Sequence, residues 1–138
     1  FIYLFEEDKR FINKVKPLLE AIEKGRLKGI TSIISPLEVL SAPKLEGKPE
    51  KRVVFERFFQ KTPNLSVYPL SWEVMEKAAG LRRKHSTLRT PDSIQLATAR
   101  VTHTPLFITN DESLKKLKIK NVKILLVNQV KIQELSRS

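Results

Sequence analysis

Cysteine is absent from this sequence of 138 residues, and its absence excludes disulfides, zinc–thiolate sites and thiol nucleophiles. No apolar run approaches the roughly 20 residues that a helix needs to cross a bilayer. The first residues also lack the succession of charged, apolar and small residues that marks a secretory signal. These absences indicate a cytoplasmic protein with no membrane segment.

Acidic residues are scarce relative to basic ones, since 26 Lys and Arg face 15 Asp and Glu, for a formal net charge of +11. Such an excess indicates a polyanionic partner, and nucleic acid is the leading candidate. Anionic lipid and an acidic protein are alternatives, and many lysines simply form a solvated surface. Charge therefore defines a class of ligand and no more.

What the sequence contains is the balance of a globular domain, with 41% hydrophobic and 30% charged residues. We expect one domain over residues 1–130 and a carboxy-terminal tail over 131–138. The patterns predict helices over 11–22, 35–43, 53–59, 71–85, 90–101 and 112–117, and strands over 29–34, 65–70, 105–109 and 122–127. Pro17 fits the first turn of a second short helix, and Ser71 fits an N-cap. Strands alternating with helices predict an α/β layered fold around a mainly parallel sheet.

Three acidic residues stand at corresponding places in this pattern. Glu38 follows the strand over 29–34, Asp111 follows the strand over 105–109, and Asp92 starts a helix. Because ligands of open α/β sheets bind at the carboxyl ends of the strands, we expect the three side chains to converge. Carboxylates about 4 to 5 Å apart repel by roughly 4 kcal/mol at an effective dielectric of about 20, so a cluster needs protons or cations. Oxygen ligands without His or Cys suit Mg²⁺ or Mn²⁺.

Each acid also has a structural explanation. Ser35 and Glu38 fit an S-x-x-E capping box. Thr90 can cap the helix whose first turn holds Asp92, where the helix dipole favours an anion. Asp111 can accept a hydrogen bond from the free N–H groups of the helix that follows it. Taken singly, each residue fits either role.

Other side chains near these acids carry weaker signals. Candidate phosphate contacts are Arg82, Arg83, Lys84 and Arg89 before Asp92, and Lys115 after Asp111. A solvated helix end whose cations complement its dipole explains the first group equally well. His85 and His103 are interpreted as surface residues, since water activated by a metal makes a histidine base unnecessary. Trp72 and Met75 are expected as core contacts of an amphipathic helix.

Four segments resemble a known family, the PIN-domain nucleases, which include the VapC-type toxins of toxin–antitoxin pairs. They are "FIYLFEED", "TSIISPLEVL", "LRTPDSIQLATA" and "FITNDESL", in the family's order and spacing and over almost the whole chain. The resemblance implies a three-layer α/β/α domain and Mg²⁺- or Mn²⁺-dependent cleavage of RNA, leaving a 5′ phosphate and a 3′ hydroxyl. It also implies that Glu38, Asp92 and Asp111 are metal ligands, with Thr109 and Asn110 shaping the pocket.

The beginning of the chain departs from this family. In relatives, a short apolar strand ending in an Asp precedes the segment similar to "FIYLF", whereas this sequence starts at Phe1 without either. We expect the native protein to carry that strand and its Asp upstream, with a truncated variant as the alternative. Composition favours a strand for "FIYLF", while the resemblance makes it the opening turns of a helix.

The resemblance also implies partners: RNA, an antitoxin that covers the acidic crevice with a basic side chain, and a second copy of the chain. The homodimer would use helices around Phe5, Phe11 and residues 55–59, although burial in the core is the alternative. One rival function is a catalytically inactive PIN-like module that binds nucleic acid or protein. A phospho-acceptor signalling domain is a second rival, but no predicted strand supplies its central Asp.

Overall fold

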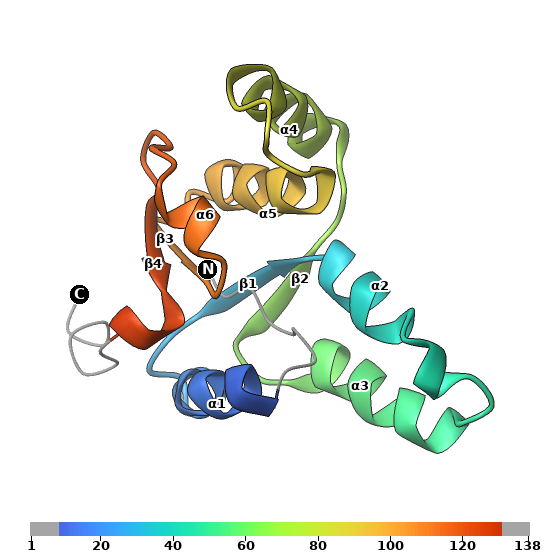
Figure 1. Cartoon of the computed structure of the whole chain (residues 1–138). Coiled ribbons are helices and arrows are strands. Elements are labelled where there is room, and N and C mark those ends of the chain that lie inside the picture. Colours follow the sequence, from blue (N-terminus) through green and yellow to red (C-terminus); the bar gives the residue numbers. More distant parts are fainter. Residues whose placement is uncertain (1–8, 131–138) are drawn as a thin grey trace.

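A computed structural model describes residues 9–130 of the chain, with side chains described from Lys16 onward (Figure 1). Its helices are α1 (Lys9–Glu23), α2 (Ile34–Leu40), α3 (Pro49–Lys61), α4 (Trp72–Lys84), α5 (Thr90–Val101) and α6 (Glu112–Lys115). The strands are β1 (Gly29–Ser32), β2 (Leu65–Tyr68), β3 (Leu106–Thr109) and β4 (Lys123–Leu126), and short 3₁₀ helices cover Pro43–Leu45 and Val127–Gln129. The predicted alternation of helices and strands is confirmed. The segment "FIYLF" and the tail over 131–138 lie outside the described residues.

The strands pair in parallel, as the sequence predicts. β1 pairs with β2, Gly29 opposite Leu65, and β3 pairs with β4, Leu106 opposite Lys123. Among residues 9–130 these are two separate pairs, and no ladder of backbone hydrogen bonds joins them into one sheet. The α/β class is therefore confirmed, with the described strands arranged as two parallel pairs.

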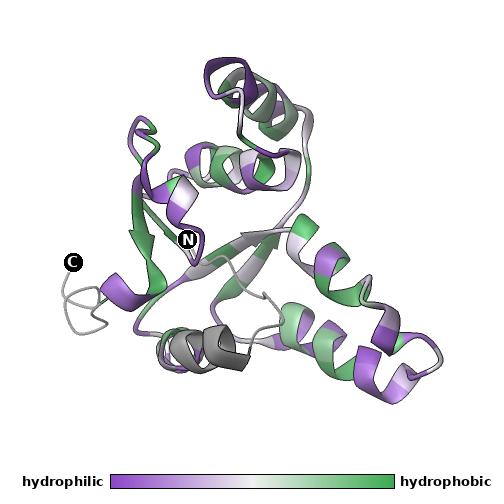
Figure 2. Ribbon diagram, viewed as in Figure 1, coloured by the Kyte–Doolittle hydropathy of each residue, from purple (hydrophilic) through white to green (hydrophobic). Residues whose placement is uncertain are grey.

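Helices cover the strands on both faces, which gives the three layers seen in Figure 1. Neighbouring residues of β3 point to opposite faces, as in any strand. Phe107 packs in a core with Val74 and Leu96 from α4 and α5. Ile108 packs in a second core with Ile22 from α1. Figure 2 shows hydrophobic residues along the strands and hydrophilic residues at the outer helix ends, including the end of α4 beside the α4–α5 turn.

Gly29 lets α1 lie close to β1. A Cβ atom at this position would stand 2.7 Å from Ile22 Cδ1 and 3.1 Å from Leu65 Cδ1. Ile22 is fully buried and packs in the second core, so its side chain has little room to move. A larger residue at position 29 would push α1 away from the strand.

Local signals in the sequence had mixed outcomes. Ser71 is the N-cap of α4, and its side chain accepts a hydrogen bond of 3.2 Å from the Val74 N–H, which confirms that prediction. Pro17 does not start a second helix, because α1 continues through it. The strand predicted over 29–34 ends at Ser32, whose Oγ accepts a hydrogen bond from the Ile34 N–H as α2 begins. None of the described helices is long and apolar enough to span a bilayer.

Candidate active site

Asp92 lies in the first turn of α5 and is buried, with 4% of its surface exposed. Burying a carboxylate is costly unless charged or polar groups compensate it. One such group is Arg89, whose Nε lies 3.4 Å from Asp92 Oδ2. The prediction that Thr90 caps this helix is wrong, because α5 begins at Thr90 itself and Arg89 is the N-cap residue. The backbone around position 89 therefore places Asp92 and its cationic neighbour together.

Asp111 is fixed at the end of β3 by hydrogen bonds to its own segment. Its Oδ1 accepts hydrogen bonds from the Ser113 N–H, at 2.9 Å, and from Ser113 Oγ, at 2.6 Å. The Asp111 N–H donates to Oγ1 of the buried Thr109 at 3.1 Å. The capping explanation is thus correct, since Asp111 is the N-cap of α6. Both contacts with Ser113 use Oδ1, so capping leaves Oδ2 available for a ligand.

Asp92 and Asp111 line the same small pocket, of about 120 Å³. Its other lining residues are Thr87, Leu88, Arg89, Ser113, Leu114 and Leu117. The pocket opens between the start of α5 and the end of β3, which is the edge where the sequence predicts a site. Two of the three predicted acids are therefore brought together.

Glu38 is not among the residues that line this pocket; it is exposed on α2. Within residues 9–130, no group of three His, Cys, Asp or Glu side chains is placed to hold a metal together. The assignment of Glu38, Asp92 and Asp111 as metal ligands stays a prediction.

A buried polar network connects the helix that carries Glu38 to the helix that carries Asp92. Gln95 is fully buried; its Oε1 accepts a hydrogen bond of 3.2 Å from the Ser32 N–H, and its Nε2 donates to Ser35 Oγ at 2.7 Å. Ser35 Oγ also lies 2.6 Å from Thr31 Oγ1. The predicted capping box at Ser35 is therefore wrong, because α2 begins at Ile34 and the Ser35 hydroxyl faces the interior.

The sequence did not identify this network. A glutamine in the otherwise apolar run "IQLA" was the signal that could have shown it, because a buried amide must find partners.

The predicted phosphate-binding residues occupy different surfaces. Arg82 Nε donates to the Leu88 carbonyl at 3.1 Å and holds the α4–α5 loop. Lys115 Nζ donates to the Ile124 carbonyl at 2.8 Å, so it ties α6 to β4. Arg83 and Lys84 line a separate hollow along α4. Of the predicted basic residues, Arg89 is the one that lines the acidic pocket.

The donors in this pocket fit a hard divalent cation. Two carboxylates and the Ser113 hydroxyl supply oxygen atoms, and the sequence contains no thiol. Mg²⁺ commonly binds one or two carboxylates and completes its shell with water and substrate phosphate. The chemistry of these donors is therefore compatible with Mg²⁺, and the binding of a metal by Asp92 and Asp111 stays a prediction.

Comparison with known proteins gives the following findings. The model of a family described as PIN domain matches residues 1–120. No curated protein matches the sequence. A similar solved structure, described as "Toxin-antitoxin complex from Klebsiella pneumoniae", is 22% identical, with a TM-score of 0.55 and coverage of 81% of this chain and 87% of that chain. At this level of identity the likeness concerns the fold alone.

Proposed function

This chain belongs to the PIN-domain family, and from that premise we propose that it is a metal-dependent endoribonuclease. PIN domains are generally nucleases that use divalent metal ions. The observation that carries the proposal is the shared pocket of Asp92 and Asp111 at the end of β3. The net charge of +11 supports a polyanionic substrate.

In this proposal Asp92, Asp111 and Glu38 on α2 would act as ligands of Mg²⁺ or Mn²⁺. When bound, the ion would supply Lewis-acid chemistry for activating water and for offsetting negative charge at the scissile phosphate. The chain itself orients the acids: the amino terminus of α6 fixes Asp111, and the first turn of α5 fixes Asp92. Because both carboxylates are held before substrate binds, little reorganisation is needed during the reaction.

Arg89 is suited to hold the RNA at this pocket. Its side chain is 72% exposed although its Nε lies beside the buried Asp92. A guanidinium has several N–H donors, so it can contact a carboxylate and a phosphate oxygen together. Thr109 would act indirectly, since its Oγ1 accepts the Asp111 N–H and so orients that residue. We also propose that Asn110 shapes the same rim.

Partners follow from the same proposal. The similar structure is described as a toxin–antitoxin complex, which supports a toxin-like role with an antitoxin partner. The cytoplasmic location stays a prediction. The homodimer stays a proposal: Phe5 and the Phe11 side chain lie outside the described residues, whereas Phe59 is buried and Phe58 packs in the second core. A short protein that is encoded beside this chain and co-purifies with it would support the toxin role, while harmless overexpression would count against it.

A second candidate function is a catalytically inactive module that binds nucleic acid or protein. The observation that favours it is that Glu38 is exposed and does not line the pocket of the other two acids. The two functions differ in cleavage but share the basic surface, so an activity assay separates them.

The decisive experiment incubates the full protein with labelled RNA in Mn²⁺, in Mg²⁺ and in EDTA. We expect the original chain to cleave the RNA in Mn²⁺ or Mg²⁺ but not in EDTA. We expect Asp92→Asn and Asp111→Asn to lose this cleavage. Asn is as good an N-cap as Asp, so the Asp111→Asn fold should stay within about 0.5 kcal/mol of the original stability. Glu112→Gln is the matched control, because it removes a neighbouring exposed carboxylate outside the pocket. Cleavage that persists in EDTA or in both Asn variants would refute the metal mechanism.

A further inference from the structure

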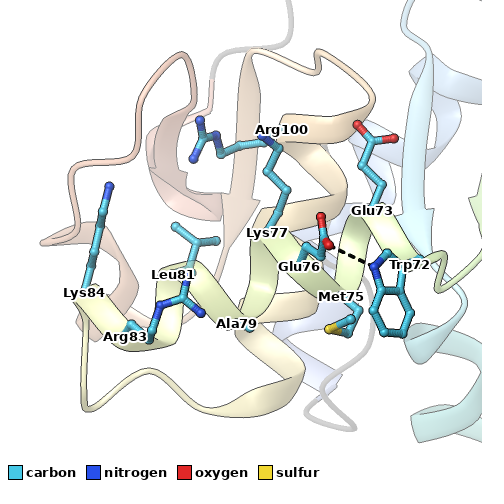
Figure 3. A pocket seen from close by; sticks show the side chains of 11 residues that line it. Trp72, Glu73, Met75, Glu76, Lys77, Ala79, Leu81, Arg83, Lys84 and Arg100 are labelled. Atoms are coloured by element: carbon cyan, nitrogen blue, oxygen red, sulfur yellow. Dashed lines mark hydrogen bonds between the residues drawn. The ribbon is translucent and has the colours of Figure 1, made fainter.

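A hollow of about 930 Å³ runs along α4 and shares no lining residue with the acidic pocket (Figure 3). Trp72 stands at one end of it, and the basic side chains that line it are Lys77, Arg83, Lys84 and Arg100. We call this surface the α4 groove. We propose that the α4 groove binds single-stranded RNA, with a base stacked on Trp72 and phosphates held by the basic residues. This inference rests on the proposed function and extends it to a segment of the substrate beyond the cleaved bond.

Trp72 contributes little to the core, contrary to the expectation from its helix pattern. It is 74% exposed, whereas Val74, Ala78 and Leu81 form the buried face of α4. Its Nε1 donates a hydrogen bond of 2.8 Å to Glu76 Oε1, which holds the indole in one orientation (Figure 3). An exposed and oriented aromatic ring is the feature on which proteins stack unpaired bases.

The charge of the groove favours a polyanion over an apolar peptide. Its lining has the basic residues named above, while its acids are Glu73 and Glu76 at the Trp72 end. Helix dipoles explain Arg83 and Lys84 in the last turn of α4 and Arg100 in the last turn of α5, but they do not explain Lys77 in the middle of α4. An adjoining hollow of about 420 Å³ shares Lys77 and Arg100 and adds Lys120. Cations therefore continue past the groove onto the neighbouring surface.

The basic end of the groove lies beside the wall of the acidic pocket. Arg82, in the last turn of α4, donates to the Leu88 carbonyl, and Leu88 lines the pocket of Asp92 and Asp111. The proposal takes one RNA strand from the acidic pocket over the α4–α5 loop into the groove. The 13 residues of α4 extend about 20 Å, the length of roughly six nucleotides in a stacked strand.

Trp72 provides its own assay because it is the single tryptophan of the sequence. The full chain in EDTA, which prevents metal-dependent cleavage, is titrated with an oligouridylate of about twelve nucleotides, enough to span the groove. We expect saturable quenching of the tryptophan emission as a base stacks on the indole. Fluorescence anisotropy of the same labelled oligonucleotide measures binding independently of Trp72.

Substitutions separate stacking from charge. Trp72→Ala should weaken binding about 5- to 150-fold, while Trp72→Phe should retain most of it because a phenyl ring still stacks. The double variant Lys77→Ala with Arg100→Ala should lower the slope of log affinity against log salt by about 1.4, at about 0.7 per phosphate contact. Lys51→Ala with Lys61→Ala is the charge-matched control, since both lysines are exposed on the distant α3.

The outcomes separate this proposal from the proposed nuclease activity. The proposal that the α4 groove binds RNA is overturned if anisotropy shows binding while the Trp72 emission stays unchanged. This conclusion holds even if cleavage is normal. The α4 groove is also overturned if Trp72→Ala binds the oligonucleotide as tightly as the original chain. It is overturned as well if a co-purified protein covers Trp72 and excludes RNA. Quenching and the expected losses without any cleavage support the α4 groove while refuting the nuclease.

Discussion

Replacing Gln95 by Leu should destabilise the fold by about 2 to 4 kcal/mol, although the two side chains are similar in size. Gln95 is fully buried, and both ends of its amide are hydrogen-bonded to the segment around the end of β1. Leucine would leave the Ser32 N–H without this acceptor and remove a donor from Ser35 Oγ. The unsatisfied Ser32 N–H costs about 1 to 3 kcal/mol, and the lost bond to Ser35 Oγ, which keeps its contact with Thr31, costs about 1 kcal/mol more. The sum is a large share of a typical stability of about 5 to 15 kcal/mol.

Urea unfolding followed by far-ultraviolet circular dichroism measures this loss, with Gln60→Leu as control. Gln60 is exposed on α3, so the same substitution there should change stability by less than about 0.5 kcal/mol. The double variant Ser35→Ala with Gln95→Leu should lose less than the sum of the single losses, because the two residues share one bond. A loss below about 0.5 kcal/mol for Gln95→Leu, or strict additivity of the pair, would refute the buried network.

Three further changes test other contacts. Gly29→Ala should lower the free energy of unfolding, measured in urea, by about 1 to 3 kcal/mol. Adding Ile22→Val to Gly29→Ala should recover part of that loss, because it removes the Cδ1 atom that the new Cβ would meet. Equal stability of Gly29→Ala and the original chain would contradict this. Ser71→Ala should lower stability by about 0.5 to 2 kcal/mol while Ser71→Asp keeps the cap, and a thermal melt in which both variants behave alike would count against it. Lys115→Met should lower the free energy of unfolding by about 1 kcal/mol, because it removes the hydrogen bond to the Ile124 carbonyl. Unchanged stability together with weaker RNA binding would show instead that Lys115 contacts the substrate.

Signals that act within a few residues could be predicted from the sequence. Ser71 and Asp111 were recognised as caps because a helix end needs a side-chain oxygen at that position. The rule that ligands bind at the carboxyl ends of parallel strands predicts that Glu38, Asp92 and Asp111 converge, and of these Asp92 and Asp111 line one pocket while Glu38 does not line it. These inferences needed local chemistry and one rule of topology.

Contacts between distant segments could not be predicted in this way. Ser35 matched a capping box, but Gln95, 60 positions later, uses its hydroxyl inside the core. Trp72 fitted an amphipathic face, yet Val74, Ala78 and Leu81 already fill the buried side of α4. Tertiary packing decided each case, and the pattern of a single segment does not contain it.

The two hydrophobic cores imply an order of assembly for this chain. The core around Phe107 draws its buried residues from positions 74 to 124, so short loops can close it. The second core joins Leu18 and Ile22 to Ile108 and Val127, which requires closing a loop of roughly a hundred residues. We therefore expect α1 to dock last during folding and to open first, with its amides exchanging with deuterium faster than those of α5. α1 would then close the second core after the core around Phe107 has formed.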